Sequence, residues 1–478
     1  MKNISKIAII ILFIFGITSC GDDFLDRPPM LEQSTELVLQ DFNGMNSATI
    51  GLYSELYHED WYGAAFPIII DLKGDNAKSS PKSSGRYQQE YNWNQNPSQT
   101  MGGLWSIAYR VITSASNIIN AAPDVELLPG QQQAWVDHLV GEAKFIRALG
   151  HFDLVRVFAQ PYTHDPNSPG VPVITETRIG TPARNTVAEV YEQIELDLTD
   201  AINMMTADAS EFYGDHRNAA VDMKGFTSRE AAIAMMARVK LYKGDYAGAA
   251  DYASQIIDNP EDDLYSADNW LSAWGTNGAK EVIMEVYGST GNGNWPSWEE
   301  IGYIYDPSGS YGDVCATNDH LSLYEPTDVR LGIFVEPESN PGYFWPTGKY
   351  PGKDGNTRQN NIPLFRLSEM YLIRAEARLN GVAGSAADDL NAIRTRRGVA
   401  AIENPTMDDI FEERRRELGF EGHILFDYAR LGRTLEREDE DNRLTGPTTI
   451  SFPSHLWAMP IPIGEMEANP NMVQNSGY

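Results

Sequence analysis

The residues best suited to catalysis in this chain of 478 residues do not form a complete catalytic motif. His58-Glu59 begins like the HExxH zinc motif, but the second histidine is missing. Gly348-Lys349 lacks the flanking residues of a phosphate-binding loop, and no GxSxG nucleophile motif is present. Glu299-Glu300 has the residue types of a glycosidase pair, although a chain with 67 acidic residues contains such pairs by chance. The sequence therefore predicts that the protein is not an enzyme.

Metal and cofactor chemistry is equally unsupported by the residues. Two cysteines exclude a four-cysteine zinc site and a disulfide framework. The acidic run 438–441 is more typical of a solvated turn than of a calcium site. We expect no cofactor and no metal site, and a structural calcium ion stays open without an assigned position. The net charge of −30 repels phosphate backbones, so we expect no nucleic-acid partner.

Binding chemistry is better represented than catalysis, in two irregular windows near residues 72–104 and 260–360. Both windows lack a helical period, and the second is rich in aromatic residues as well as Gly, Pro, Asn and Ser. An aromatic ring covers the apolar face of a sugar or of a peptide side chain. Neighbouring polar groups then bond to the hydroxyl groups of the sugar or to the amide groups of the peptide. The candidate ligand-binding residues are Asp75, Asn76, Arg86, Tyr91, Trp93, Asn96, Trp295, Trp298, Tyr303 and Tyr311.

Trp93 and Trp298 are the favoured contacts among these candidates. The polar neighbours of Trp93 in the segment 91–94 favour an exposed ring. For every candidate aromatic residue, the competing interpretation is a core residue that anchors a loop. Trp105 and Trp135 lie on helical faces and are expected in the core.

Helices must position these windows. Apolar residues recur every three or four positions over 131–158, 187–202 and 231–241, which predicts amphipathic helices. A fourth helix begins after Asp245, and Gly244 separates it from the third, so the segment 231–257 is predicted to be a helical hairpin. Residues 364–379 and 386–396 suggest another hairpin. Thr406 and Asp409 resemble a capping box, and the charged residues that follow it are expected to pair locally at i,i+3 and i,i+4.

The N-terminus predicts export. Lys2 and Lys6 precede an apolar stretch over 7–17 that is too short to span a bilayer. The residues before Cys20 resemble the lipobox of a bacterial lipoprotein, in which this cysteine is acylated. Residues 1–19 are therefore predicted as a signal peptide and 20–34 as a lipid-anchored tether. The acidic residues after Cys20 resemble an export signal to the outer cell surface in Bacteroidetes lipoproteins.

Ordered motifs across the whole chain resemble the SusD/RagB family of Bacteroidetes outer-membrane nutrient-binding lipoproteins. The motifs that carry this resemblance are Phe24-Leu25-Asp26 after the lipobox, Trp105 with Tyr109, Ile112 and Asn117, the segments 142–149 (EAKFIRAL), 170–173 (GVPV), 366–377 (RLSEMYLIRAEA), 390–398 (LNAIRTRRG) and 412–427 (EERRRELGFEGHILFD), and the C-terminal segment 460–478. Ile424 stands where the family pattern has an arginine.

The resemblance implies an all-α dominated, SusD-like fold, in which tetratricopeptide-type helical hairpins form a scaffold and an irregular half binds ligand. The single domain is expected over 35–478, with the scaffold mainly at 105–258 and 360–425 and the ligand-binding half mainly at 60–104 and 260–358. Its implied partners are a SusC-type TonB-dependent transporter, a glycan ligand and the outer membrane, which is reached through the lipid. Arg147, Glu369, Glu376 and Arg415 are expected to be buried pairing residues.

Three alternatives stay open at this point. A protein with this fold and this transporter partner could carry a glycan or a peptide, because both suit an aromatic platform. A glycoside-processing enzyme and a tetratricopeptide adaptor, which binds protein through its helical groove, are the two other classes of function. No motif identifies the sugar.

Overall fold

The structure is a computed structural model that describes residues 35–205, 223–259, 263–288, 299–353, 355–437 and 443–478. Helices dominate the described residues, so the predicted all-α character is confirmed. None of these helices has the length and apolar character needed to cross a membrane. The longer helices are α3 (Phe42–Leu56), α4 (Ala65–Lys73), α6 (Gly102–Ala121), α7 (Gln133–Phe158), α8 (Val187–Met204), α10 (Arg229–Lys243), α11 (Tyr246–Ile257), α15 (Leu367–Leu379), α16 (Ala386–Arg396), α17 (Met407–Leu418) and α18 (Ile424–Arg430).

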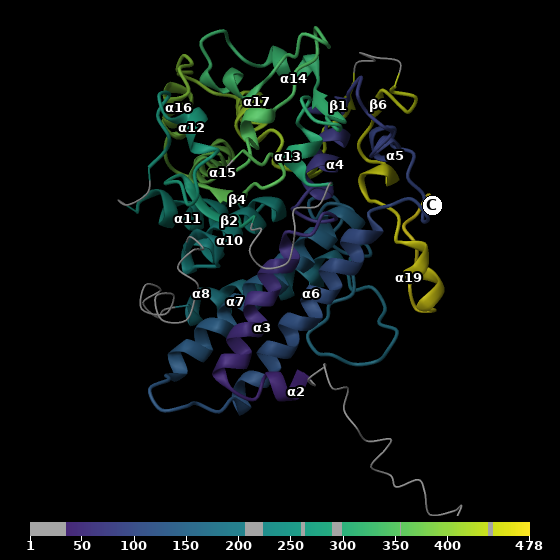
Figure 1. Cartoon of the computed structure of the whole chain (residues 1–478), viewed down its shortest axis with the longest axis vertical. Coiled ribbons are helices and arrows are strands. Elements are labelled where there is room, and N and C mark those ends of the chain that lie inside the picture. Colours follow the sequence, from purple (N-terminus) through teal and green to yellow (C-terminus); the bar gives the residue numbers. More distant parts are fainter. Residues whose placement is uncertain (1–34, 206–222, 260–262, 289–298, 354, 438–442) are drawn as a thin grey trace, which may run out of the picture.

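The scaffold is a continuous series of packed helices. Each of the helices α3, α6, α7, α8, α10, α11, α15 and α16 packs against the next in that order. Figure 1 shows α3, α6, α7 and α8 in the lower half of the molecule, whereas α12 (Trp270–Ala273), α14 (Asn318–Ser322) and α17 lie in the upper half. One hydrophobic cluster extends through the scaffold and into the irregular segments, so the two halves share a core.

The predicted hairpin over 231–257 is confirmed, and its residues explain its geometry. Helix α10 ends at Lys243, and the next residue, Gly244, adopts φ 76°. Glycine has no side chain, so it adopts this left-handed conformation without the steric cost that other residues would incur. The side chain of Asp245 then accepts a hydrogen bond from the backbone N–H of Gly248 at 3.0 Å and caps α11. Buried alanines at 249, 250 and 253 let the two helices approach closely.

The described residues contain three short two-stranded ribbons, of which β2–β4 joins the irregular half to the scaffold. Their strands are β1 (Ala77–Ser79) with β3 (Val314–Ala316), β2 (Val282–Val286) with β4 (Ile362–Arg366), and β5 (Leu435–Glu436) with β6 (Thr449–Ile450), all antiparallel. The helix expected from residue 364 therefore begins only at Leu367, because residues 362–366 pair with β2. Long-range strand pairing overrides the local helical pattern there.

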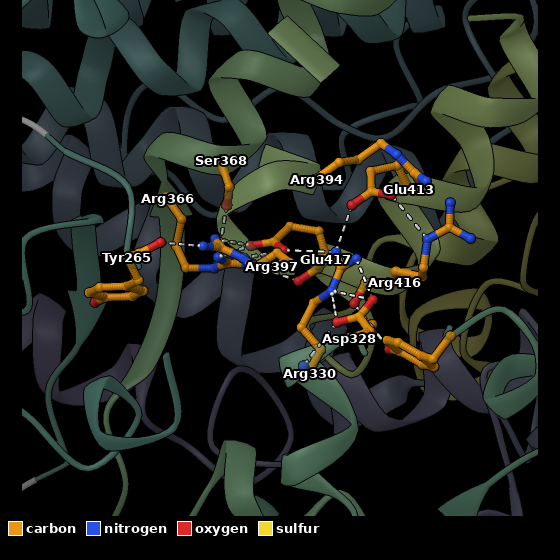
Figure 2. A network of polar contacts seen from close by, with 12 residues as sticks. Tyr265, Asp328, Arg330, Arg366, Ser368, Arg394, Arg397, Glu413, Arg416 and Glu417 are labelled. Carbon is orange, nitrogen blue, oxygen red and sulfur yellow. Dashed lines mark hydrogen bonds and ion pairs between the residues drawn. The ribbon is translucent and has the colours of Figure 1, made fainter. Parts of the chain in front are cut away.

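Acidic and basic side chains of α17 form the centre of a buried ionic network (Figure 2). The Glu417 carboxylate accepts hydrogen bonds from Arg330 at 3.0 Å, Arg366 at 2.9 Å and Arg397 at 2.8 Å. These four side chains are almost completely buried. Burial by itself would raise the pKa of Glu417. The positive charges of the arginines nevertheless hold this pKa well below its ordinary value.

The prediction that the charged residues of α17 pair mainly within the helix is wrong. Arg416 does contact Glu413 and Glu412 on its own helix. Glu413 also binds Arg330 at 2.7 Å, far along the chain, and Glu417 joins residues from three other segments. The buried pairs expected from the family motifs are confirmed: Arg147 with Asp197, Glu369 with Arg238, Glu376 with Arg430, and Arg415 with Asn76 and Asp319.

We expect Glu417→Gln to destabilise the protein by about 3–5 kcal/mol, because it leaves three buried guanidinium groups with one carboxylate fewer. Chemical denaturation measures this loss. Glu412→Gln is the matched control, since Glu412 is half-exposed in its ion pair with Arg416 and its loss should cost at most about 0.5 kcal/mol. Equal effects of the two changes would contradict the central role of Glu417.

Candidate functional site

Three of the predicted ligand-binding residues meet at one partly exposed place. Arg86 lies just before α5 (Gln88–Tyr91), Tyr303 lies in α13 (Ile301–Ile304), and Tyr311 lies between α13 and β3. The Arg86 guanidinium carbon is 3.8 Å from the centroid of the Tyr311 ring, and the two tyrosine rings are 4.7 Å apart at 44°. We call this cluster, together with Glu299 and Asp313, the Arg86 site.

Two carboxylates fix the position of Arg86. The Nε and Nη2 atoms of Arg86 donate to the two oxygens of Glu299 at 2.6 and 2.9 Å, which is a bidentate pair. Its Nη1 atom donates to Ser84 at 2.6 Å and lies 3.4 Å from Asp313. The hydrogen bond with Glu299 raises the pKa of Arg86, so the guanidinium stays charged at every physiological pH.

Strand pairing brings the two chain segments of the site together. β1 and β3 align Ser79 with Val314, and the pairing continues as the N–H of Ser80 donates to the carbonyl of Asp313 at 2.8 Å. The Asp313 carboxylate then accepts from the backbone N–H and the hydroxyl of Ser84 at 2.7 and 2.9 Å. Gly312 adopts φ 78°, which permits the turn between Tyr311 and Asp313.

Glu300 caps the N-terminus of α13, the short helix that carries Tyr303. It is fully buried and accepts from Tyr57 at 3.1 Å, from the N–H of Gly302 at 2.8 Å and from Asn360 at 3.2 and 3.3 Å. All of these donors are neutral. Burial therefore dominates and raises the pKa of Glu300 to about 8, so the side chain is mostly protonated at neutral pH.

The remaining candidates of the early window are mostly core residues. Trp93 was expected to be exposed, and this is wrong: its ring is 4% exposed, lies 3.5 Å below the Lys73 ammonium and packs edge-on against Trp457. The polar neighbours of Trp93 in the chain favour exposure, but residues from distant segments, Lys73 and Trp457, cover its ring. Tyr91 is likewise buried beneath Arg437.

Asp75 and Asn76 serve the fold instead of a surface. Both are buried, and Asp75 adopts φ 65°. The Asn76 side chain donates to Asp71 at 2.8 Å and accepts from Arg415 at 3.1 Å. Asn96 is exposed, but it lies in a turn closed by Gln99. Trp295, Trp298 and Cys20 lie outside the described residues.

Three residues that contact Arg86 or its partners, Glu299, Asp313 and Ser84, were not among the predicted ligand-binding residues. Glu299 was noticed only as half of an acidic pair, because its partner Arg86 lies 213 positions away. The only local signal for Asp313 is its place directly after a tyrosine and a glycine.

Another hollow lies away from the Arg86 site. Trp105 and Tyr109 of α6, the loop 172–182, and Glu465 and Asn469 at the C-terminal end line a groove of about 620 Å³. Trp105 is only 5% exposed, in agreement with its predicted place in the core. Among the described residues, no group of three or more His, Cys, Asp or Glu side chains is arranged to hold a metal ion.

The buried Glu300 predicts a pH-dependent stability. In the unfolded chain this group ionises near its ordinary pKa of about 4.5, whereas the folded protein keeps the proton up to about pH 8. The unfolded state therefore binds fewer protons between these values, and stability falls by up to roughly 1.4 kcal/mol per pH unit as the pH rises through this range. Glu300→Gln should flatten this part of the profile in denaturation curves recorded from pH 5 to 8.

The exposed Glu403→Gln is the control for this experiment and should leave the profile unchanged. An unchanged slope in Glu300→Gln would show that Glu300 is already ionised in the folded protein.

Comparison with known proteins places the chain in a family. Residues 336–478 match the model of the SusD family, and residues 23–241 match the model described as starch-binding associating with outer membrane. A SusD-like protein of Formosa agariphila is 24% identical over 99% of this chain and the whole of its own length.

Solved structures agree with these matches. A Bacteroides vulgatus protein to which sugar binding is ascribed has a TM-score of 0.82 and 31% identity, over 92% of this chain and 99% of its own. A SusD superfamily protein of Bacteroides thetaiotaomicron has a TM-score of 0.82 and 28% identity, over 91% and 99%. The helical scaffold, the ordered sequence motifs and these matches lead to one conclusion: the chain belongs to the SusD/RagB family.

Proposed function

We propose that this protein is a cell-surface lipoprotein that captures a glycan at the Arg86 site and delivers it, unchanged, to a SusC-type TonB-dependent transporter. The observation that carries the proposal is the pair of partly exposed tyrosines, Tyr303 and Tyr311, held beside a fixed guanidinium and carboxylate. Rigid phenol rings lose little entropy on binding and suit the C–H face of a sugar ring.

Family membership supports the outer-membrane location, since one matching family model is described as starch-binding and associating with the outer membrane. The lipobox-like segment that ends at Cys20 supplies an anchor. A lipoprotein held at the surface cannot itself move cargo across the membrane, so a transporter partner follows from the proposed role. A peptide is the alternative cargo, because aromatic platforms also hold peptide side chains.

We expect Tyr311→Ala to weaken glycan binding at least about 10-fold, with a smaller loss of stability than the removal of a fully buried ring would cause, because Tyr311 is only partly buried where it packs against the core. Calorimetry of the detergent-solubilised full chain with a panel of polysaccharides and peptides measures the effect. Trp93→Ala is the informative contrast, since removal of a buried tryptophan should cost about 3–5 kcal/mol of stability. A cargo that binds equally to wild type and Tyr311→Ala would move the site elsewhere, with the groove beside Tyr109 as the next place to test.

We expect Cys20→Ala to release the protein from the outer membrane, because the acylated sulfur would be its attachment point. Metabolic labelling with a fatty acid and protease accessibility on intact cells measure lipidation and surface exposure. Affinity purification of the wild-type protein should recover a TonB-dependent barrel protein. Labelling that persists in Cys20→Ala would contradict the assigned anchor.

A further inference from the structure

We propose that the Arg86 site selects uncharged glycans and rejects glycans that carry carboxylate or sulfate groups, and that Glu299 is the residue that sets this selectivity. The inference rests on the proposed glycan-binding function and adds the charge class of the ligand. It is carried by how the charges of the site are paired and exposed.

The guanidinium of Arg86 is already occupied. Recognition of a carboxylate or sulfate by arginine uses two parallel N–H groups in a fork. In Arg86, the Nε and Nη2 groups that make such a fork are held by Glu299 at 2.6 and 2.9 Å, and Nη1 is directed at Ser84. One face of the guanidinium plane also lies on the Tyr311 ring. An anionic ligand would have to displace an internal carboxylate to gain this contact.

Lys82, close to the Arg86 site in the chain, is bonded within the protein as well. The Lys82 ammonium donates to the carbonyl of Gly309 at 2.7 Å and to the carbonyl of Pro307. These bonds fix the loop that leads from α13 to Tyr311. Lys82 therefore shapes the tyrosine platform, and its reorientation towards a ligand anion would release that loop.

In the ion pair of Arg86 with Glu299, the negatively charged side chain is the more exposed of the two. The side chain of Glu299 is 35% exposed, whereas that of Arg86 is 23% exposed. An approaching ligand therefore meets a carboxylate at least as readily as the guanidinium. Asp313 and Asp306 add two further carboxylates, which are buried and hydrogen-bonded, in a chain whose net charge is −30.

The two tyrosines provide what an uncharged sugar needs. Their rings lie 4.7 Å apart and are tilted by 44°, so they present an angled surface and not a flat one. The Tyr311 hydroxyl lies 3.4 Å from Glu299, which places polar atoms at the rim of this surface. Stacking against C–H groups and bonding to hydroxyls require no counter-charge on the protein.

The test compares matched pairs of polysaccharides. Amylose, laminarin, xyloglucan and galactomannan are each used as the neutral polymer and as a derivative whose primary alcohols are oxidised to carboxylates, with alginate and chondroitin sulfate as natural polyanions. Calorimetry of the full chain is run at 50 and 500 mM NaCl. We expect a neutral polymer to bind and its oxidised form to bind at least about 10-fold more weakly at low salt, with a smaller difference at high salt because the ions screen the repulsion.

Glu299→Gln keeps the shape of the side chain and removes its charge. This substitution should narrow the difference in affinity between the neutral and oxidised polymers. The control Glu403→Gln, which changes an exposed residue far along the chain, should leave that difference in affinity unchanged. A polyanion that binds more tightly than the neutral polymers, loses affinity at high salt and is lost in Tyr311→Ala would overturn the charge selectivity while leaving the glycan-binding function intact. If no polymer binds, or if binding is unaffected by Tyr311→Ala, the proposed function or its site fails, and this inference fails with it.

Discussion

The fold depends on the requirement that buried charges be compensated. Glu417 brings together Arg330, Arg366 and Arg397, which come from the irregular half, from the end of β4 and from the end of α16. An unpaired guanidinium in this interior would cost several kcal/mol, so the network admits only arrangements in which all of these segments are docked. Such a network adds little net stability, because removing the ions from water offsets much of their attraction.

The same helix connects the scaffold to the proposed binding site. Arg415 of α17 donates to the Asn76 side chain at 3.1 Å and to the backbone carbonyl of Asp75 at 3.2 Å, directly before β1. β1 then pairs with β3, which begins one residue after Asp313. The backbone of α17, the hydrogen bonds of Arg415 and the pairing of β1 with β3 thus link the ionic network to the carboxylate beside Arg86. Residues first expected to touch ligand, such as Asn76, are part of this connection.

The charges of the Arg86 site are balanced differently from those of the buried network. Its arginine is paired and stacked but still partly exposed, so its contribution to stability is modest and its effect is to orient Tyr311. At the start of α13, Glu300 needs no counter-charge, because neutral donors surround it and it keeps its proton.

The sequence by itself determined the helices, their caps and the family motifs, because these are read from residues within a few positions of each other. The hairpin with Gly244 and Asp245 and the capping box at Thr406 are examples of such local information. Only the tertiary structure decided which loop residues are exposed: Trp93 is covered by Lys73 and Trp457, and Glu299 finds Arg86 across more than 200 positions. The burial of Trp93 and the pairing of Arg86 arise from contacts between distant segments, so no local pattern encodes them.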